Sequence, residues 1–138
     1  AAIANMTTAL RPGGAMTHFM PCRNAPFAIA NRLLGNERAR KLLFTLFPEK
    51  RTYGGFPAYY DRCVPQQISR LCRHNRLHMV QLDTYFASEY LSFCTPLYTL
   101  DLARQVALQK LGMRNFCETM AVVARKPVRD AAAVRRAA

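Results

Sequence analysis

The chain has 138 residues, with 20 Lys and Arg against 8 Asp and Glu, which gives a formal net charge of +12. This length fits one small domain, and a hydrophobic content of 51% excludes a disordered basic tail. A chain this short also leaves little room for both a nucleotide-cofactor site and a substrate site. No apolar run approaches the roughly 18 residues of a membrane-spanning helix, so no membrane span is expected.

The five cysteines are odd in number and form no C-x-x-C pair; they are Cys22, Cys63, Cys72, Cys94 and Cys117. With only three histidines in the chain, this pattern predicts free thiols in a reducing compartment and no metal site. The first ten residues have no basic region before their apolar residues, so a secretory signal is not expected. These features together favour the cytoplasm or an organelle matrix, the mitochondrial matrix included.

The N-terminal part predicts a helix, a tight turn and a strand. Residues 2–10 have helical periodicity, and Arg11-Pro12-Gly13-Gly14 ends that helix. The following segment, 15–20, predicts a strand that stops at Pro21.

Two more helices are predicted next, over 25–34 and 37–47, with Asn24 and Asn36 as their N-caps. The inward face of the second helix is expected to hold Ala39, Leu42, Leu43 and Leu46. Residues 49–56 are predicted to form a loop.

The C-terminal part alternates helices and strands. An amphipathic helix is predicted over 64–75, a strand over 77–86, a longer helix over 97–111 and a final strand over 118–126. The sequence therefore indicates an α/β protein.

Three of these segments resemble one family. Leu10-Arg11-Pro12-Gly13-Gly14 before a hydrophobic strand resembles the L-(R/K)-P-G-G turn before strand five of class I S-adenosylmethionine-dependent methyltransferases. The helix over 64–75 and strand over 77–86 resemble that family's last helix and strand six, and 122–127 resembles the end of strand seven. Many small-molecule members carry a helical insertion that ends in an F-P-x-Y-Y-like stretch, which 56–60 matches.

The resemblance implies the C-terminal half of a Rossmann-like methyltransferase fold. Its three strands would follow the order five-seven-six, with strand seven antiparallel and helices flanking the sheet. Residues 1–127 would form this half-domain, 24–63 its helical lid insertion, and 128–138 a basic tail rich in Ala and Arg. Function would then be that of a methyltransferase part acting on a small molecule.

The departures from the family concern the cofactor. S-adenosylmethionine is held in the family by a Gly-rich loop after strand one and an acidic residue after strand two, and neither is present. The chain alone is therefore expected neither to bind the cofactor nor to catalyse. The usual R-x-G-F step before strand six is also altered, because Asn75-Arg76-Leu77 has no Gly.

A sheet of this kind would leave the edge of strand five unpaired. Such an edge pairs readily with another chain. The expected partners are the missing N-terminal half or other protein subunits along that edge.

Three residues are candidates for substrate binding. Arg23 follows strand five at its carboxyl end, where open α/β sheets bind ligands. Tyr59 and Tyr60 lie in the lid segment and offer hydroxyls to a substrate. The alternatives are a plain surface Arg and packing of the tyrosines. Apolar segments 42–47 and 91–100 suit either an apolar substrate or the core.

A second hypothesis is structural. A methyltransferase remnant without its cofactor half would serve as a non-catalytic basic subunit of an RNA-containing assembly, such as a mitochondrial ribosome. Phosphate contacts are then expected from Arg38, Arg40, Lys41, Arg70, Arg73 and Arg76. The plainer alternative is a solvated basic face.

Overall fold

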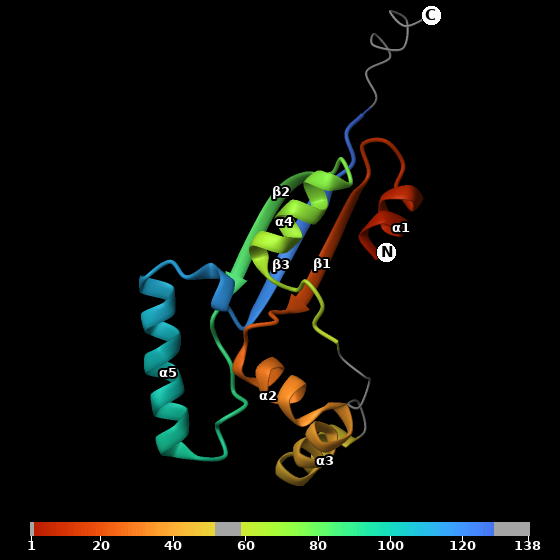
Figure 1. Ribbon diagram of the computed structural model, residues 1–138. Helices are drawn as coiled ribbons and strands as arrows, with labels where there is room; N and C mark the ends of the chain where they lie inside the picture. The colour runs from red at the N-terminus through yellow and green to blue at the C-terminus, as the bar shows by residue number, and fades with distance from the viewer. Residues whose placement is uncertain (1, 52–58, 129–138) are drawn as a thin grey trace, which may run out of the picture.

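The computed structural model describes residues 2–51 and 59–128. Within them, β1 (Ala15–Pro21), β2 (His78–Tyr85) and β3 (Thr119–Arg125) form one open sheet in the order β1-β3-β2 (Figure 1). β3 is antiparallel to both neighbours, so β1 and β2 run parallel to each other. The expected strand order and directions are thus confirmed.

The helices divide into two groups around this sheet. α4 lies along the sheet and α1 lies beside β1, whereas α2, α3 and α5 lie beyond the ends of β1 and β2 (Figure 1). Their bounds are α1 (Ala2–Ala9), α2 (Pro26–Leu34), α3 (Asn36–Leu46), α4 (Pro65–His74) and α5 (Thr95–Lys110), with short 3-10 turns η1 (Pro48–Arg51) and η2 (Arg114–Phe116). None of the described helices combines the length and apolar character needed to cross a bilayer.

The turn into β1 depends on its two glycines. Gly13 has a φ of 80°, a conformation that strains other residues, and its N–H donates to the carbonyl oxygen of Lys126 at 2.9 Å. A Cβ on Gly14 would lie 2.9 Å from the carbonyl oxygen of Arg11. Glycine at both positions therefore allows the tight turn and its close contact with the chain after β3.

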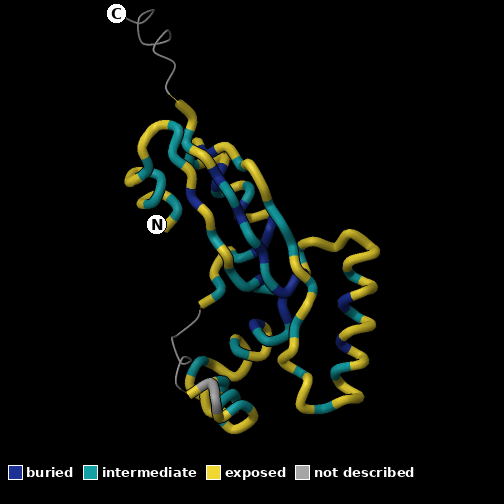
Figure 2. The backbone as a smooth tube through the Cα atoms, turned by 180° about the vertical axis from the view of Figure 1, so that it is seen from behind, coloured by how far each residue is buried: buried dark blue, intermediate teal, exposed yellow. Residues whose placement is uncertain are grey.

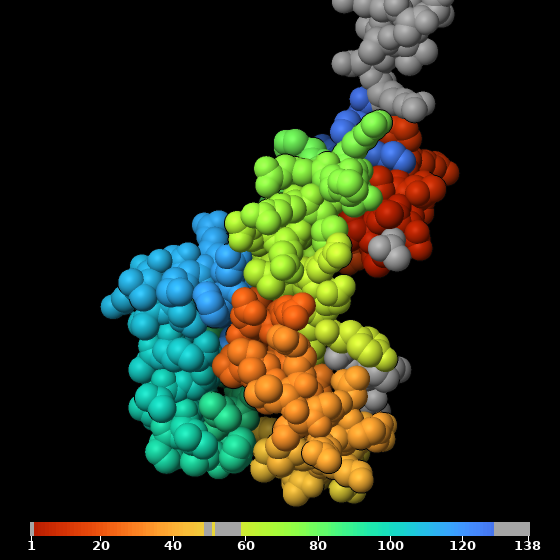
Figure 3. All heavy atoms as spheres, viewed as in Figure 1, coloured from red at the N-terminus to blue at the C-terminus, as the bar shows by residue number. Residues whose placement is uncertain are grey.

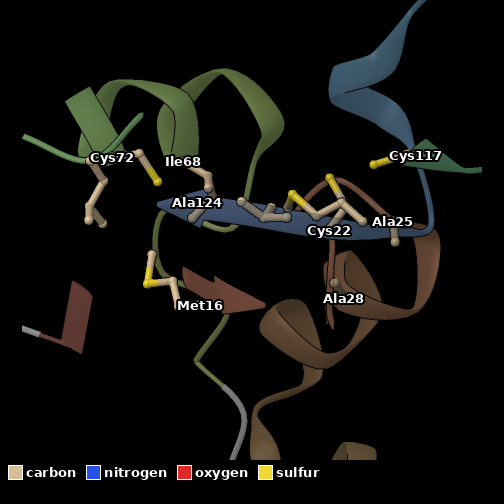
Figure 4. Packing of buried hydrophobic residues seen from close by; sticks show 11 residues of the cluster. Met16, Cys22, Ala25, Ala28, Ile68, Cys72, Cys117 and Ala124 are labelled. Carbon is tan, nitrogen blue, oxygen red and sulfur yellow. The ribbon is translucent and has the colours of Figure 1, made fainter. Parts of the chain in front are cut away.

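The core lies on one face of the sheet. β3 alternates along its length, and its buried positions Met120, Val122 and Ala124 are at most 1% exposed. They belong to one cluster with Ile68 and Cys72, which are four residues apart on α4 and so share a helical face (Figure 4). The amphipathic pattern of α4 is what places this helix on the sheet.

The opposite face of the sheet is open. No described helix lies over the strands in the view from behind (Figure 2). Phe19 on β1 is 71% exposed and Tyr85 on β2 is 45% exposed, with their ring centroids 6.0 Å apart. Phe19 and Tyr85 thus form an exposed aromatic contact on a face that also carries the polar residues Thr17, Gln81 and Asp83.

Helix α5 buries polar side chains and exposes apolar ones. It buries Asp101 and Gln105, which are 7% and 5% exposed, and it exposes Leu100 and Val106. Figure 2 shows this helix mostly exposed, with its buried and half-buried positions along one side. A helix that turns a carboxylate inward must provide that carboxylate with hydrogen-bond partners.

Both predicted Asn caps are wrong. α2 begins after Ala25 with Pro26 in its first turn, and the side-chain amide of Asn24 instead donates to the carbonyl oxygen of Asn115 at 2.9 Å. Asn36 is already the first residue of α3, and its side-chain oxygen accepts a hydrogen bond from Asn31 at 3.2 Å. In both cases the Asn side chain hydrogen-bonds to another Asn residue and not to the N–H groups at the start of the helix.

Candidate functional site

A cavity of about 480 Å³ lies beyond the carboxyl ends of the two parallel strands. One wall is α2 and α3, which follow β1, and the other is segment 88–101, which follows β2. Figure 3 shows these two groups of residues meeting at the lower end of the molecule. In open α/β sheets, ligands bind at this edge.

The walls are mainly apolar. They include Leu42, Leu43 and Leu46 of α3 and Leu91 and Phe93 of the opposite segment. Leu42 and Leu46 are 48% and 38% exposed. The helix face that was expected to point into a closed core therefore faces an open cavity, and both apolar segments singled out in the sequence contribute to it.

An aromatic group forms part of the lining. Phe27 stacks on Tyr90 with ring centroids 4.7 Å apart, and it meets Tyr60 edge-on at 6.0 Å. Burial, followed by the nearby charges of Tyr90 and Cys63, raises the pKa of Tyr60. Burial likewise raises the pKa of Tyr90, with Glu118 adding to it. Both phenols therefore stay protonated and able to donate a hydrogen bond at neutral pH.

An ion network stands behind one end of the cavity. Asp101, which lines the cavity, accepts hydrogen bonds from Nε of Arg104 at 2.7 Å and from Nε2 of Gln105 at 2.6 Å. Arg104 also pairs with Oε1 of Glu118, a residue that is 2% exposed. Oε2 of Glu118 is buried without a hydrogen-bond partner among the described residues.

The charges of this network are not balanced. Two carboxylates, Asp101 and Glu118, share one guanidinium. Burial raises the pKa of Glu118, and the hydrogen bond and charge of Arg104 oppose that rise. The structure thus places an excess of acidic groups at one end of an apolar cavity.

The three predicted substrate-binding residues have different positions. Tyr60 lines the cavity, with a φ of 48° that turns the chain there. Tyr59 is 76% exposed and is not part of the lining. Arg23 is also outside the lining, and its guanidinium lies 3.8 Å from Asp61. The rest of the predicted lid motif, 56–58, lies outside the described residues.

Two buried thiols lie at the end of β1 nearest the cavity. Cys22 and Cys117 are both fully buried and lie at the same end of the core cluster (Figure 4). A hydrogen bond from the Cys117 side chain lowers the pKa of Cys22 to about 7, against an opposing effect of burial. The same hydrogen bond raises the pKa of Cys117. Cys22 is thus the thiol of the pair that ionises first, and in its protonated form it donates to the carbonyl oxygen of Asn115 at 3.4 Å.

The basic residues named in the sequence do not form one surface. Arg38, Arg40 and Lys41 lie on α3 beyond the carboxyl ends of β1 and β2, and Arg40 pairs with Glu37 at 2.8 Å. Arg70, Arg73 and Arg76 are exposed on α4 and the turn that leads into the start of β2. The two groups are at opposite ends of the sheet (Figure 1).

Acidic residues are distributed unevenly along the strands. Among the side chains that the structure describes, no carboxylate lies within ion-pair distance of Arg70, Arg73 or Arg76. Of the acidic side chains described, Asp83 lies on β2, and the others lie in the segments beyond the carboxyl ends of β1 and β2; they are Glu37, Asp61, Glu89, Asp101 and Glu118. Those segments carry basic residues as well, so the amino ends of the strands, which we call the basic end, differ in holding cations without described acidic neighbours.

Sequence reasoning did not single out Asp101, Arg104 or Glu118. A signal was present for the first of them, because Asp101 interrupts an apolar run inside a predicted helix. No sequence pattern pairs residue 104 with residue 118, since that contact arises only when the chain returns to the sheet.

No three His, Cys, Asp or Glu side chains of the described ranges come together as a metal site. Comparison with protein-family models, with curated proteins and with solved structures finds no match to the chain. Its function has to be inferred from the cavity, the open sheet and the charges described above.

Proposed function

We propose that the chain is the acceptor-binding, C-terminal half of a class I S-adenosylmethionine-dependent methyltransferase that acts on a small apolar molecule. The observation that carries this proposal is the cavity at the carboxyl ends of β1 and β2, walled by segments inserted after each strand. The strand order β1-β3-β2, with β3 antiparallel, is the order that the resemblance implies.

The residues described here do not fit the cofactor. The Gly13-Gly14 pair precedes β1 and so lies at the end of the strand opposite the cavity, where it contacts the chain after β3. It cannot cradle a cofactor whose methyl group must reach the cavity. The proposal therefore assigns S-adenosylmethionine to a complementary half.

The free edge of β1 offers that half a place to pair. Lys126 N donates to Gly14 O at one end of the strand, and Cys22 N donates to Glu118 O at the other, both at 2.8 Å. Hydrogen-bonded positions alternate along an antiparallel strand, so the N–H groups of Thr17 and Phe19 point away from β3. We assign this edge to the strand that the complementary half contributes.

Within the proposed enzyme, the cavity residues bind and orient the acceptor. Leu42, Leu43 and Phe93 remove its apolar body from water, and the hydroxyl of Tyr60 is available to hold a polar atom.

The test uses this chain together with the polypeptide encoded upstream of it. Cofactor binding is measured by calorimetry, and methyl transfer is measured with labelled S-adenosylmethionine and a panel of small apolar acceptors. Leu43→Asp, on the cavity wall, is expected to abolish transfer and to leave cofactor binding intact. Leu33→Asp is the matched control, because Leu33 is 81% exposed and outside the cavity. An upstream polypeptide that binds no cofactor contradicts the proposal.

The cations without described acidic neighbours favour a second candidate, a non-catalytic subunit that contacts RNA through its basic end. Arg70, Arg73 and Arg76 supply cations without described acidic neighbours, and Arg125 at the end of β3 is exposed at the same end. Such contacts release counterions, so binding would weaken steeply with salt.

The second candidate is tested by titrating the chain with single-stranded RNA at several salt concentrations. Changing Arg70, Arg73 and Arg76 to Gln is expected to lower the slope of log K against log salt by about 2. The same change at Arg38, Arg40 and Lys41 is the matched control and is expected to have a smaller effect. Equal slopes for the two variants contradict an RNA contact at the basic end.

A further inference from the structure

The acidic residue on the cavity wall is unusual for an apolar pocket. Asp101 is 7% exposed. Burying a carboxylate costs free energy, and an apolar side chain of similar volume at the same position would avoid that cost. The two oxygens of Asp101 accept one hydrogen bond each from Arg104 and Gln105, which leaves further lone pairs for a donor in the cavity.

Among the charged residues that line the cavity, Asp101 is the one whose negative charge is not matched by a cation of its own. Glu37 and Arg40 also line the cavity, and they neutralise each other through their 2.8 Å contact. The only described cation paired with Asp101 is Arg104, which Asp101 shares with Glu118. The wall thus lacks one positive charge on the side of α5.

The aromatic group adds a second feature that suits a cation. In the lining, the ring centroid of Phe27 lies 4.7 Å from that of Tyr90 and 6.0 Å from that of Tyr60. The faces of such rings attract ammonium groups, most strongly where water is excluded.

We propose that the cavity selects an apolar ligand that carries a protonated amine, and that Asp101 is the specificity-determining residue that receives the amine. This inference rests on the proposed function only in taking the cavity as the acceptor site. The apolar body lies between α3 and segment 91–93, and the ammonium group donates a hydrogen bond to Asp101.

The experiment compares three probes with the same apolar body: phenylhexylamine, phenylhexanol and phenylhexanoate. Their dissociation constants for the chain are measured at neutral pH by ligand-observed NMR or calorimetry. The amine is expected to bind at least about tenfold more tightly than the alcohol, as a charge-assisted hydrogen bond predicts, and the carboxylate is expected to bind most weakly. This order is measured on the unchanged chain and depends on no variant.

Asp101→Asn is expected to reduce the affinity for the amine to that for the alcohol. Glu89→Gln is the matched control, because it also removes one carboxylate, at an exposed position outside the lining, and it is expected to retain the preference. Circular dichroism and thermal melting establish that each variant is folded.

The outcomes separate the two proposals. Equal binding of the three probes, or a preference for the amine that survives Asp101→Asn, overturns the assignment of Asp101 and leaves the acceptor cavity standing. Absence of binding by all three probes contradicts the acceptor cavity itself, and the amine proposal fails with it.

Discussion

Arg104 on α5 pairs with Glu118 at the start of β3, and this contact ties the outlying helix to the sheet. The guanidinium also holds Asp101 at 2.7 Å, so a single side chain pairs with two buried carboxylates. The buried face of α5 is polar, and its attachment depends on this network rather than on apolar packing.

Arg104→Met is therefore expected to lower the free energy of unfolding by about 2–3 kcal/mol, because two carboxylates lose their partner while remaining buried. The loss should shrink as pH falls through the pKa of Glu118, which burial raises against the opposing effect of Arg104, because a protonated Glu118 no longer needs the guanidinium. Chemical denaturation at several pH values measures both effects. Lys110→Met, an exposed position in the last turn of the same helix, is the control and should change stability by less than about 0.5 kcal/mol. A pH-independent loss would contradict the role given to the carboxylates.

Arg76→Gly is expected to stabilise the chain by about 0.5–1 kcal/mol. Arg76 has a φ of 56°, a left-handed conformation that costs a side-chain-bearing residue about 1–2 kcal/mol and costs glycine much less. Arg73→Gly provides the opposite sign, because Arg73 lies within α4, where glycine costs about 1 kcal/mol. Thermal melting of the two variants distinguishes them, and stabilisation by neither would show that Arg76 is not strained.

The opposite pKa shifts of Cys22 and Cys117 lead to a prediction about pH. Cys117→Ala removes the hydrogen bond that lowers the pKa of Cys22 to about 7, so that pKa should rise. The thiolate absorbance in the ultraviolet measures the titration. Cys72→Ala is the control, since burial alone raises the pKa of Cys72 and it should leave the Cys22 step in place.

The sign of the accompanying stability change follows from the same shift. A folded-state pKa below the ordinary value of 9.0 contributes stability above that value, and the contribution is lost as pH falls through about 7. The destabilisation by Cys117→Ala should therefore be larger at alkaline pH than below about pH 6. A destabilisation that does not depend on pH would indicate lost packing only.

Amide hydrogen exchange tests the free edge of β1. The N–H groups of Thr17 and Phe19 point away from β3, so they are expected to exchange at least about tenfold faster than those of His18 and Met20. Addition of the complementary half should slow Thr17 and Phe19 selectively. Uniform exchange along β1 in the isolated chain would contradict the assigned hydrogen-bonding pattern.

Much of the fold follows from local sequence patterns. The strand over 15–20 and the amphipathic helix over 64–75 were predicted within one residue at each end, because their periodicity and their Pro and Gly boundaries are local. The absence of a glycine before β2 was also visible in the sequence. Its consequence, the left-handed Arg76, was not predicted, since it requires the backbone angles.

The site was less predictable for a physical reason. Of the two lid tyrosines, only Tyr60 lines the cavity, and adjacent residues on a turn cannot be assigned to opposite sides without the turn's geometry. Asn24 is a residue type that often caps helices, but its side-chain amide donates to the carbonyl oxygen of Asn115, 91 residues away in the sequence. Long-range contacts of this kind, like that between Arg104 and Glu118, leave no periodic signal.

The two walls of the cavity are attached to strands that are not neighbours. β3 lies between β1 and β2, so the attachment points are two strand spacings apart, about 10 Å. The hydrogen bonds of β3 to both neighbours therefore fix how far apart the two walls attach to the sheet. Substitutions of wall side chains change the lining of the cavity and leave this spacing of the backbone unchanged.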